Sequence, residues 1–212
     1  MIPYPVSKMN QRNRFHLDQF PLILASQSPR RHALFKMMDI PVDVISSQWD
    51  EVQDWEGEPC ELVTINSFYK ARAVSEQYPS RLVIGADTIV VLNGQILGKP
   101  ENREQALEML SQLSGTTHTV TTGISILCQD RDVQMSLVES TQVTVTEISD
   151  DDRIYYVDTY QPWDKAGSYG IQEWFSVHIT HIDGCYYNVM GLPVSTVYAA
   201  LKFILLDRTT TS

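Results

Sequence analysis

Apolar and polar positions change along the chain from a strand period to a helix period and back. The run Leu22–Ala25 is short and wholly apolar, as in a buried strand, and residues 29–38 follow with apolar positions at helical spacing. Ser28 is a favourable N-cap, and Pro29 stands at the first helical position, where its missing N–H costs no hydrogen bond. The pattern predicts a strand, a turn and a helix.

The middle of the chain predicts a second helix and a long buried strand. Residues 43–61 are rich in carboxylates and have no lysine or arginine, which is typical of a loop or an exposed edge. Apolar residues at helical spacing over 62–73 then indicate an amphipathic helix. Residues 82–92 have a strand pattern, and the Asn-Gly pair after them is a strong hairpin signal, so residues 95–97 should return antiparallel.

The C-terminal half continues the alternation of helices and strands. Six further elements are predicted from capping and periodicity: a helix over 102–115, strands over 120–126 and 133–145, a helix over 149–160, a strand over 174–182 and a helix over 193–206. Interleaved helices and strands with an antiparallel hairpin predict an α/β fold with a mixed central sheet rather than a purely parallel one.

Composition and charge narrow the class of protein. The chain has 212 residues, of which 43% are hydrophobic and 20% charged, as in a globular protein with one large domain. Its formal net charge of -10 disfavours nucleic acid or an anionic membrane as the main partner, because both repel a negative surface. A small anion in a local basic pocket stays compatible with this charge.

The cysteines and the lengths of the apolar runs indicate in which cellular compartment the protein is expected. Cys60, Cys128 and Cys185 are widely separated and match neither a disulfide framework nor a zinc site. The sequence has no apolar run long enough to span a bilayer and no apolar signal core at its start. We therefore expect a cytoplasmic protein.

The first candidate binding segment is Ser26-Gln27-Ser28-Pro29-Arg30-Arg31, at the predicted strand-to-helix turn. A helix N-terminus offers free N–H groups and the positive end of a dipole. The hydroxyl and guanidinium groups add donors whose geometry suits phosphate. The same pattern also fits an ordinary capped helix with solvated arginines, so the segment alone is not specific.

The second candidate is Asp87, which lies within the apolar strand pattern. A carboxylate is costly to bury there unless it is paired or binds a metal. Gly85 and Ala86 are expected to leave room for a ligand, and Mg²⁺ is typically held by one or two carboxylates together with substrate phosphates. A structural aspartate bonded to a neighbouring backbone group or lysine is the alternative.

Other residues carry little signal by themselves. Lys70, Lys99 and Lys165 resemble ordinary solvated lysines, and Glu51 belongs to the acidic stretch. Gln172 ends a small-residue turn, where an amide can bind a base edge through its donor and acceptor. The histidines lack a metal-binding spacing, and the motifs of serine hydrolases and P-loop NTPases are missing from the sequence.

Taken together, these segments resemble the Maf family of nucleotide pyrophosphatases. The matching stretches are LILASQSPRR (22–31), KARAV (70–74), VIGADTIVVLNGQILGKP (83–100), LSGTTHTVTTGISI (113–126), DKAGSYGIQ (164–172) and GCYYNVMGLP (184–193). They occur in the family's order. Residues 1–20 lie outside the resemblance, so we expect an N-terminal extension over 1–20 and one domain over 21–207.

The resemblance implies an elongated α/β fold, with a mixed sheet between two lobes around a cleft. It also implies a protein that is often a homodimer. It implies hydrolysis of a nucleoside triphosphate to the monophosphate and pyrophosphate with a divalent metal cation (Mg or Mn), as house-cleaning of the nucleotide pool. By motif, the implied catalytic residues are Asp87, Glu51, Lys70 and Lys99. Asp87 and Glu51 are also the implied metal ligands. The implied substrate-binding residues are Ser26, Arg30, Arg31, Thr88, Gln172 and Lys165.

The Ile171-Gln172 pair resembles the subfamily that prefers dTTP and UTP, with Arg30, Thr88 and Gln172 at its specificity positions. Two alternatives stay open. One is the same chemistry on 7-methyl-GTP or another modified nucleotide, and the other is a nucleotide-binding regulator with little turnover.

The sequence departs from the family pattern at two places. Residues 173–176, Glu-Trp-Phe-Ser, replace a smaller and Gly-rich continuation, a change that can reshape the base pocket. Asn66-Ser67 stands where the family helix often has Leu-Ala, and we expect this change to affect packing only.

Overall fold

The computed structural model describes residues 15, 17, 20–52 and 55–207, and these form a mixed α/β architecture. Within them a seven-stranded sheet has the order β2-β1-β3-β5-β6-β7, with β4 paired to β3. Its strands are β1 (Leu22–Ala25), β2 (Asp43–Val44), β3 (Leu82–Leu92), β4 (Gln95–Leu97), β5 (Thr117–Cys128), β6 (Val133–Val145) and β7 (Ile179–Asp183). Strand β1 pairs in parallel with β2 and β3, whereas the other pairs are antiparallel, so the predicted mixed sheet is confirmed.

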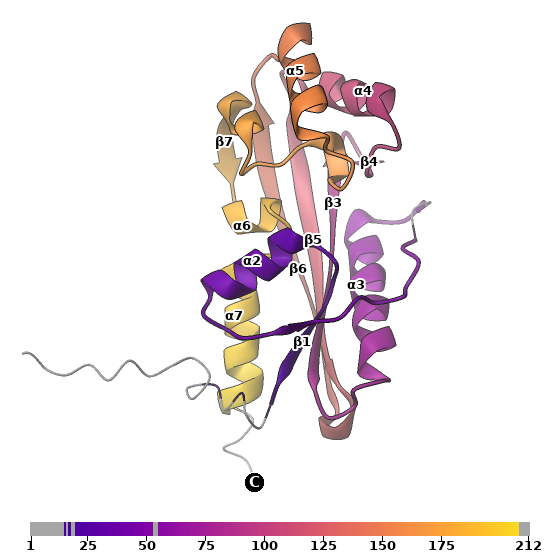
Figure 1. The fold of residues 1–212 in the computed structure, drawn as a ribbon, viewed down its shortest axis with the longest axis vertical. Coiled ribbons are helices and arrows are strands. Elements are labelled where there is room, and N and C mark those ends of the chain that lie inside the picture. The colour runs from indigo at the N-terminus through magenta and orange to yellow at the C-terminus, as the bar shows by residue number, and fades with distance from the viewer. Residues whose placement is uncertain (1–14, 16, 18–19, 53–54, 208–212) are drawn as a thin grey trace, which may run out of the picture.

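Helices cover both faces of this sheet, and the molecule is elongated along its long strands (Figure 1). The helices are α2 (Pro29–Met37), α3 (Pro59–Ser75), α4 (Arg103–Leu113), α5 (Asp150–Tyr160), α6 (Tyr186–Val189) and α7 (Val194–Lys202). Short 3-10 turns are η1 (Gln129–Arg131), η2 (Ala166–Ser168) and η3 (Trp174–His178), and a π-helical turn, η4 (Phe203–Asp207), follows α7. Helix α3 lies on one side of β1 and β3, and α2 and α7 lie on the other.

The alternation of side chains along β1 explains this layering. Leu22 and Leu24 pack into the cluster that contains the apolar faces of α2 and α7. Ile23 and Ala25 point to the opposite face, where they pack with Ala71 of α3. Since successive strand residues face opposite sides, a wholly apolar strand requires cover on both sides.

Local capping signals place the helix starts where the sequence predicts them. The side chain of Ser28 accepts a hydrogen bond from the N–H of Arg31, and Asn102 and Ser149 cap α4 and α5 in the same way. The predicted hairpin is also present, because β4 returns antiparallel to β3 after the Asn93-Gly94 turn.

Two glycines let α3 lie unusually close to the sheet. A Cβ atom on Gly85 would lie 2.2 Å from the carbonyl oxygen of Ser67, and one on Gly123 would lie 2.3 Å from that of Val63. The expectation that Gly85 leaves room for a ligand is therefore wrong, because the backbone of α3 occupies that space. The close approach brings the polar face of α3 against the middle of β3.

A second apolar cluster closes the other end of the molecule. It joins the ends of β3, β5 and β6 to α4, α5 and η3, and Tyr156 and Phe175 are among its fully buried side chains. The predicted strand over 174–182 is wrong in its first half, since residues 174–178 form η3. A 3-10 turn puts Phe175 and His178, three residues apart, on the same buried side, which a strand cannot do.

The start of the chain contributes to the first cluster. The expected extension, residues 1–20, lies outside the described residues except for Phe15, Leu17 and Phe20, which are buried among the residues packed with α2 and α7. The Phe15 ring packs edge-on against Tyr198 of α7, with ring centroids 5.3 Å apart. Within the described part of the chain, no helix has both the length and the apolar character needed to cross a membrane.

Candidate active site

A pocket of about 490 Å³ lies between the two apolar clusters, at the middle of β3. This volume falls within the range of small-molecule binding sites. Its walls come from the N-terminus of α2, the 46–51 loop, α3, β3 and the segment 164–172. All ten residues expected at the site line it: Ser26, Arg30, Arg31, Glu51, Lys70, Asp87, Thr88, Lys99, Lys165 and Gln172.

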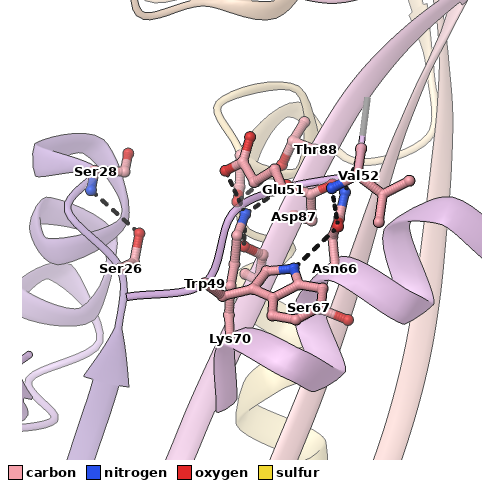
Figure 2. Close-up of polar contacts among 12 residues, drawn as sticks. Ser26, Ser28, Trp49, Glu51, Val52, Asn66, Ser67, Lys70, Asp87 and Thr88 are labelled. Carbon is pink, nitrogen blue, oxygen red and sulfur yellow. Dashed lines mark hydrogen bonds and ion pairs between the residues drawn. The ribbon is translucent and has the colours of Figure 1, made fainter. Parts of the chain in front are cut away.

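Two carboxylates and two ammonium groups alternate on one side of the pocket. Lys70 Nζ lies 2.6 Å from Asp87 Oδ1 and 2.6 Å from Glu51 Oε1. Lys99 Nζ lies 3.3 Å from the other oxygen of Glu51. Lys70 and Asp87 are each only 6% exposed, and Figure 2 shows Lys70 of α3 reaching up between the two carboxylates. Asp87 is thus paired, as a buried carboxylate must be, yet it still lines an open pocket.

The two lysines keep Glu51 ionised. Burial by itself would raise the pKa of Glu51, but the charge and hydrogen bond of Lys70, and then those of Lys99, lower this pKa from 4.5 to about 2. The carboxylate of Glu51 is therefore negative throughout the physiological range.

This shift predicts a pH-dependent contribution of Glu51 to stability. At pH 7 the Glu51→Gln variant should be less stable than the wild-type protein. Because the pKa of Glu51 is lower in the folded protein than its ordinary value of 4.5, the unfolded chain takes up the proton first as the pH falls. The difference in unfolding free energy between the two proteins should therefore disappear between about pH 4.5 and about pH 2, as measured by urea unfolding at a series of pH values.

The control for that series is Glu76→Gln, which removes one member of the exposed Arg72–Glu76 pair. Exposed ion pairs of this kind contribute little to stability, so this variant should stay close to the wild type throughout. A Glu51→Gln deficit that stayed constant down to about pH 2 would contradict the role of Lys70 and Lys99 in holding Glu51 charged.

The opposite wall of the pocket carries donors around the N-terminus of α2. Arg31 spans the wall, since its Nε donates to the carbonyl oxygen of Gly191 at 2.8 Å and its Nη2 donates to Thr88 Oγ1 at 2.8 Å. Burial lowers the pKa of Arg31, while the charges of Asp87 and Glu51 act in the opposite direction. An arginine side chain stays protonated in spite of such a shift, so the wall is positive.

Arg30 belongs to a second chain of charges at the rim. Its Nη1 lies 2.5 Å from Asp164 Oδ2, and Lys165 Nζ lies 2.8 Å from Asp164 Oδ1. Lys165 Nζ also lies 3.2 Å from Glu173, whose other oxygen accepts a hydrogen bond from the hydroxyl of Tyr156 at 2.5 Å. Glu173, one of the departures from the family pattern, therefore lies against a lysine of the pocket.

Thr88 and Gln172, two of the expected specificity positions, differ in how far their side chains are already engaged in hydrogen bonds. The hydroxyl of Thr88 is engaged with Arg31 and with Thr122, at 2.8 and 3.0 Å. Gln172 is exposed at the pocket wall. Of the two, Gln172 is the side chain placed to meet an incoming ligand.

The carboxylate oxygens of the pocket could ligate a divalent cation that binds together with a substrate. Asp87 and Glu51 supply hard carboxylate oxygens. Among the described residues, no group of three or more His, Cys, Asp or Glu side chains is arranged to hold a metal ion. Since Mg²⁺ at phosphate sites often takes only one or two carboxylates, and phosphate and water oxygens beyond those, the set is sufficient in that role.

One polar residue at the site was not expected there. Asn66 of α3 is 2% exposed, and its Nδ2 donates to Asp87 Oδ2 at 3.2 Å. The expectation that Asn66 affects packing only is therefore wrong. A usable signal was its position four residues before Lys70, which places both side chains on the same face of the helix.

A family model and the relatives similar in sequence point to one family. The family model described as Maf-like protein matches residues 21–204. A dTTP/UTP pyrophosphatase of Bacillus anthracis is 43% identical over 188 residues, which cover 89% of this chain and 97% of the relative. A dTTP/UTP pyrophosphatase of Bacillus cereus (strain AH820) matches to the same extent. Among solved structures, the Ham1 protein of Staphylococcus aureus is 19% identical with a TM-score of 0.43, over 59% of this chain and 71% of that one.

Proposed function

This chain belongs to the Maf family, and from that premise we propose that it hydrolyses nucleoside triphosphates, dTTP and UTP above others, to the monophosphate and pyrophosphate. The observation that carries the proposal is the cluster of the buried Asp87 and Lys70 with the half-buried Glu51, which faces the donor-rich N-terminus of α2 across one pocket. A strand carboxylate beside two lysines suits chemistry on a polyanion.

The triphosphate enters on the positive wall. The N-terminus of α2, the hydroxyl of Ser26 and the guanidinium groups of Arg30 and Arg31 supply donors for phosphate oxygens. These groups offset the repulsion expected from a chain with a net charge of -10. Lys99, which is largely exposed, can turn from Glu51 toward a phosphate when one is bound.

The chemical step is attack of water on the α-phosphorus. Asp87 accepts a proton from that water as the new P–O bond forms. The bond between the α-phosphorus and the bridging oxygen breaks, and pyrophosphate leaves with the electron pair. Lys70 and Lys99 stabilise the charge that spreads over the phosphate oxygens in the transition state.

A divalent cation is part of the proposal, with Asp87 and Glu51 as its protein ligands. When bound, it would supply charge neutralisation at the phosphates and a more acidic water. A homodimer and a cytoplasmic location belong to the same proposal. The homodimer rests on the resemblance to the family, and the location rests on the cysteine content and the apolar pattern of the sequence.

The base is selected at Gln172. The N3–H and O4 of uracil or thymine form a donor–acceptor pair that matches the oxygen and nitrogen of one amide side chain. The Gln172→Leu variant should therefore lose about tenfold in kcat/KM for UTP, the effect of one lost hydrogen bond of about 1.4 kcal/mol. Gln134→Leu, a change on an exposed position of β6, is the matched control and should leave kcat/KM unaltered.

The experiment that tests the function is pyrophosphate release by the purified protein with Mg²⁺ or Mn²⁺, across dTTP, UTP, CTP, 7-methyl-GTP and the common purine triphosphates. Preference for dTTP and UTP would support the proposal. Preference for 7-methyl-GTP would keep the chemistry and overturn the assignment of Gln172. Binding of nucleotides without release of pyrophosphate would instead point to a regulator.

A further inference from the structure

The side chain of Asn66 connects the 49–52 loop to Asp87 of β3, two parts of the active site that are distant in sequence. Its Nδ2 donates to Asp87 Oδ2 at 3.2 Å and to the carbonyl oxygen of Val52 at 3.1 Å. Its Oδ1 accepts from the N–H of Val52 at 2.9 Å and from Trp49 Nε1 at 3.4 Å. Figure 2 shows the amide of α3 lying between the 49–52 loop and β3.

Both backbone groups of Val52 are therefore satisfied by a single side chain. Val52 directly follows Glu51, so the amide fixes the backbone beside one carboxylate of the site and contacts the other, Asp87, directly. The ring of Trp49 stacks on Tyr69 of α3, with centroids 4.5 Å apart and planes 14° apart. The loop that carries Glu51 is thus held against α3 at two points.

If residue 66 only filled space between α3 and the sheet, an apolar side chain would serve there as well as asparagine. A leucine has the same number of side-chain heavy atoms in a similar branched shape and would fill the space. It would leave the N–H and C=O of Val52 without these partners, and unpaired backbone groups are costly where water is excluded. The tether therefore requires the amide and not merely a side chain that fills the space.

We propose that Asn66 is a positioning residue, which holds Glu51 and Asp87 in the mutual arrangement that the reaction needs. This inference rests on the proposed function for its effect on turnover, whereas the tether to the 49–52 loop does not depend on any activity. Misplacement of reacting groups by about 1 Å can cost about 10²-fold in rate, so a single amide in this place can have a large kinetic effect.

The main test is the Asn66→Leu variant, followed by two measurements. Amide hydrogen exchange should become faster at residues 49–52, because Val52 has lost both of its partners, while the α3 backbone keeps its protection. Against dTTP with Mg²⁺, kcat should fall by about 10- to 100-fold, with little change in KM, because the wall formed by Ser26, Arg30 and Arg31 is untouched.

Two further variants separate positioning from a general loss of stability. Ser67→Ala removes the neighbouring buried hydroxyl of α3, which bonds to Thr64 and Ser125 and touches neither Glu51 nor Asp87. It should leave kcat and the exchange of residues 49–52 as in the wild type. Asn66→Asp keeps the size and the acceptor but replaces the donor to Asp87 with a second carboxylate, so kcat should fall although the bond from the Val52 N–H is retained.

The outcomes are distinct. Exchange at residues 49–52 unchanged in Asn66→Leu, or a kcat within twofold of the wild type, would overturn the inference. A loss of kcat in Ser67→Ala as large as in Asn66→Leu would also overturn it, because the effect would then be one of helix packing. A wild-type protein that releases no pyrophosphate would refute the proposed function, while the exchange measurement would still decide whether the tether exists.

Discussion

Replacement of Asp87 by asparagine should lower kcat for dTTP hydrolysis by on the order of 10²-fold or more. Asparagine has the same size, and its one amide oxygen can accept a hydrogen bond from either Lys70 or Asn66, so the change removes charge and basicity with little change in shape. The variant can neither take a proton from the attacking water nor hold a cation with full strength. Steady-state pyrophosphate release measures the effect.

Binding should survive this change, because the donors around the N-terminus of α2 are untouched. In a thermal melt with dTTP and Mg²⁺, Asp87→Asn should still show a nucleotide-dependent rise in Tm. The matched control is Asp158→Asn, which breaks an exposed pair with Arg103, and neither of these two residues lines the pocket. The control should keep wild-type turnover, and wild-type turnover by Asp87→Asn would refute its assignment as the catalytic carboxylate.

Much of the fold could be predicted from the sequence because its signals are local. The N-caps at Ser28, Asn102 and Ser149 and the turn at Asn93-Gly94 each depend on residues within one turn of the chain. The strand predicted over residues 174–178 was wrong because their conformation depends on contacts with residues distant in sequence. Their aromatic content favours a strand locally, but the aromatic cluster around Tyr156 and Phe175 accommodates a 3-10 turn instead.

The candidate site shows the same division between local and long-range information. The resemblance to the family supplied the ten residues that line the pocket, although most carry little signal alone. Gly85 and Asn66 were misinterpreted because their roles depend on how closely α3 approaches β3. The short distance is possible because Gly85 and Gly123 have no Cβ atoms where the backbone carbonyls of Ser67 and Val63 lie against the sheet.

Lys70 is the residue whose loss should affect stability and activity together. It is 6% exposed and provides the cation between Asp87 and Glu51. In Lys70→Met the two carboxylates would face each other without it, and removal of one partner from a buried ion pair typically costs about 3–5 kcal/mol in unfolding free energy. Turnover should fall by about 10²-fold or more, because transition-state charge on the phosphates also loses a partner.

The pH dependence identifies the cause of that instability. Lys70 is the main partner that lowers the pKa of Glu51 to about 2, so without it Glu51 should take up a proton at a higher pH. The stability deficit of Lys70→Met relative to the wild type should therefore shrink as the pH falls from about 4.5 toward about 2, where the wild type loses the stabilisation that Lys70 gives to ionised Glu51, in urea unfolding at each pH. A cavity left by the lost side chain would give a deficit that does not change with pH.

A double variant tests whether the instability of Lys70→Met comes from the repulsion between Asp87 and Glu51. Adding Glu51→Gln to Lys70→Met removes one of the two carboxylates that face each other, so it should restore part of the lost stability without restoring turnover. Lys36→Met, at an exposed position in the last turn of α2, is the control and should match the wild type in both respects. Recovery of turnover along with stability would mean that Lys70 acts only by holding the two carboxylates in place. Recovery of stability alone is the expected result, because the double variant lacks both Lys70 and Glu51, a proposed ligand of the cation.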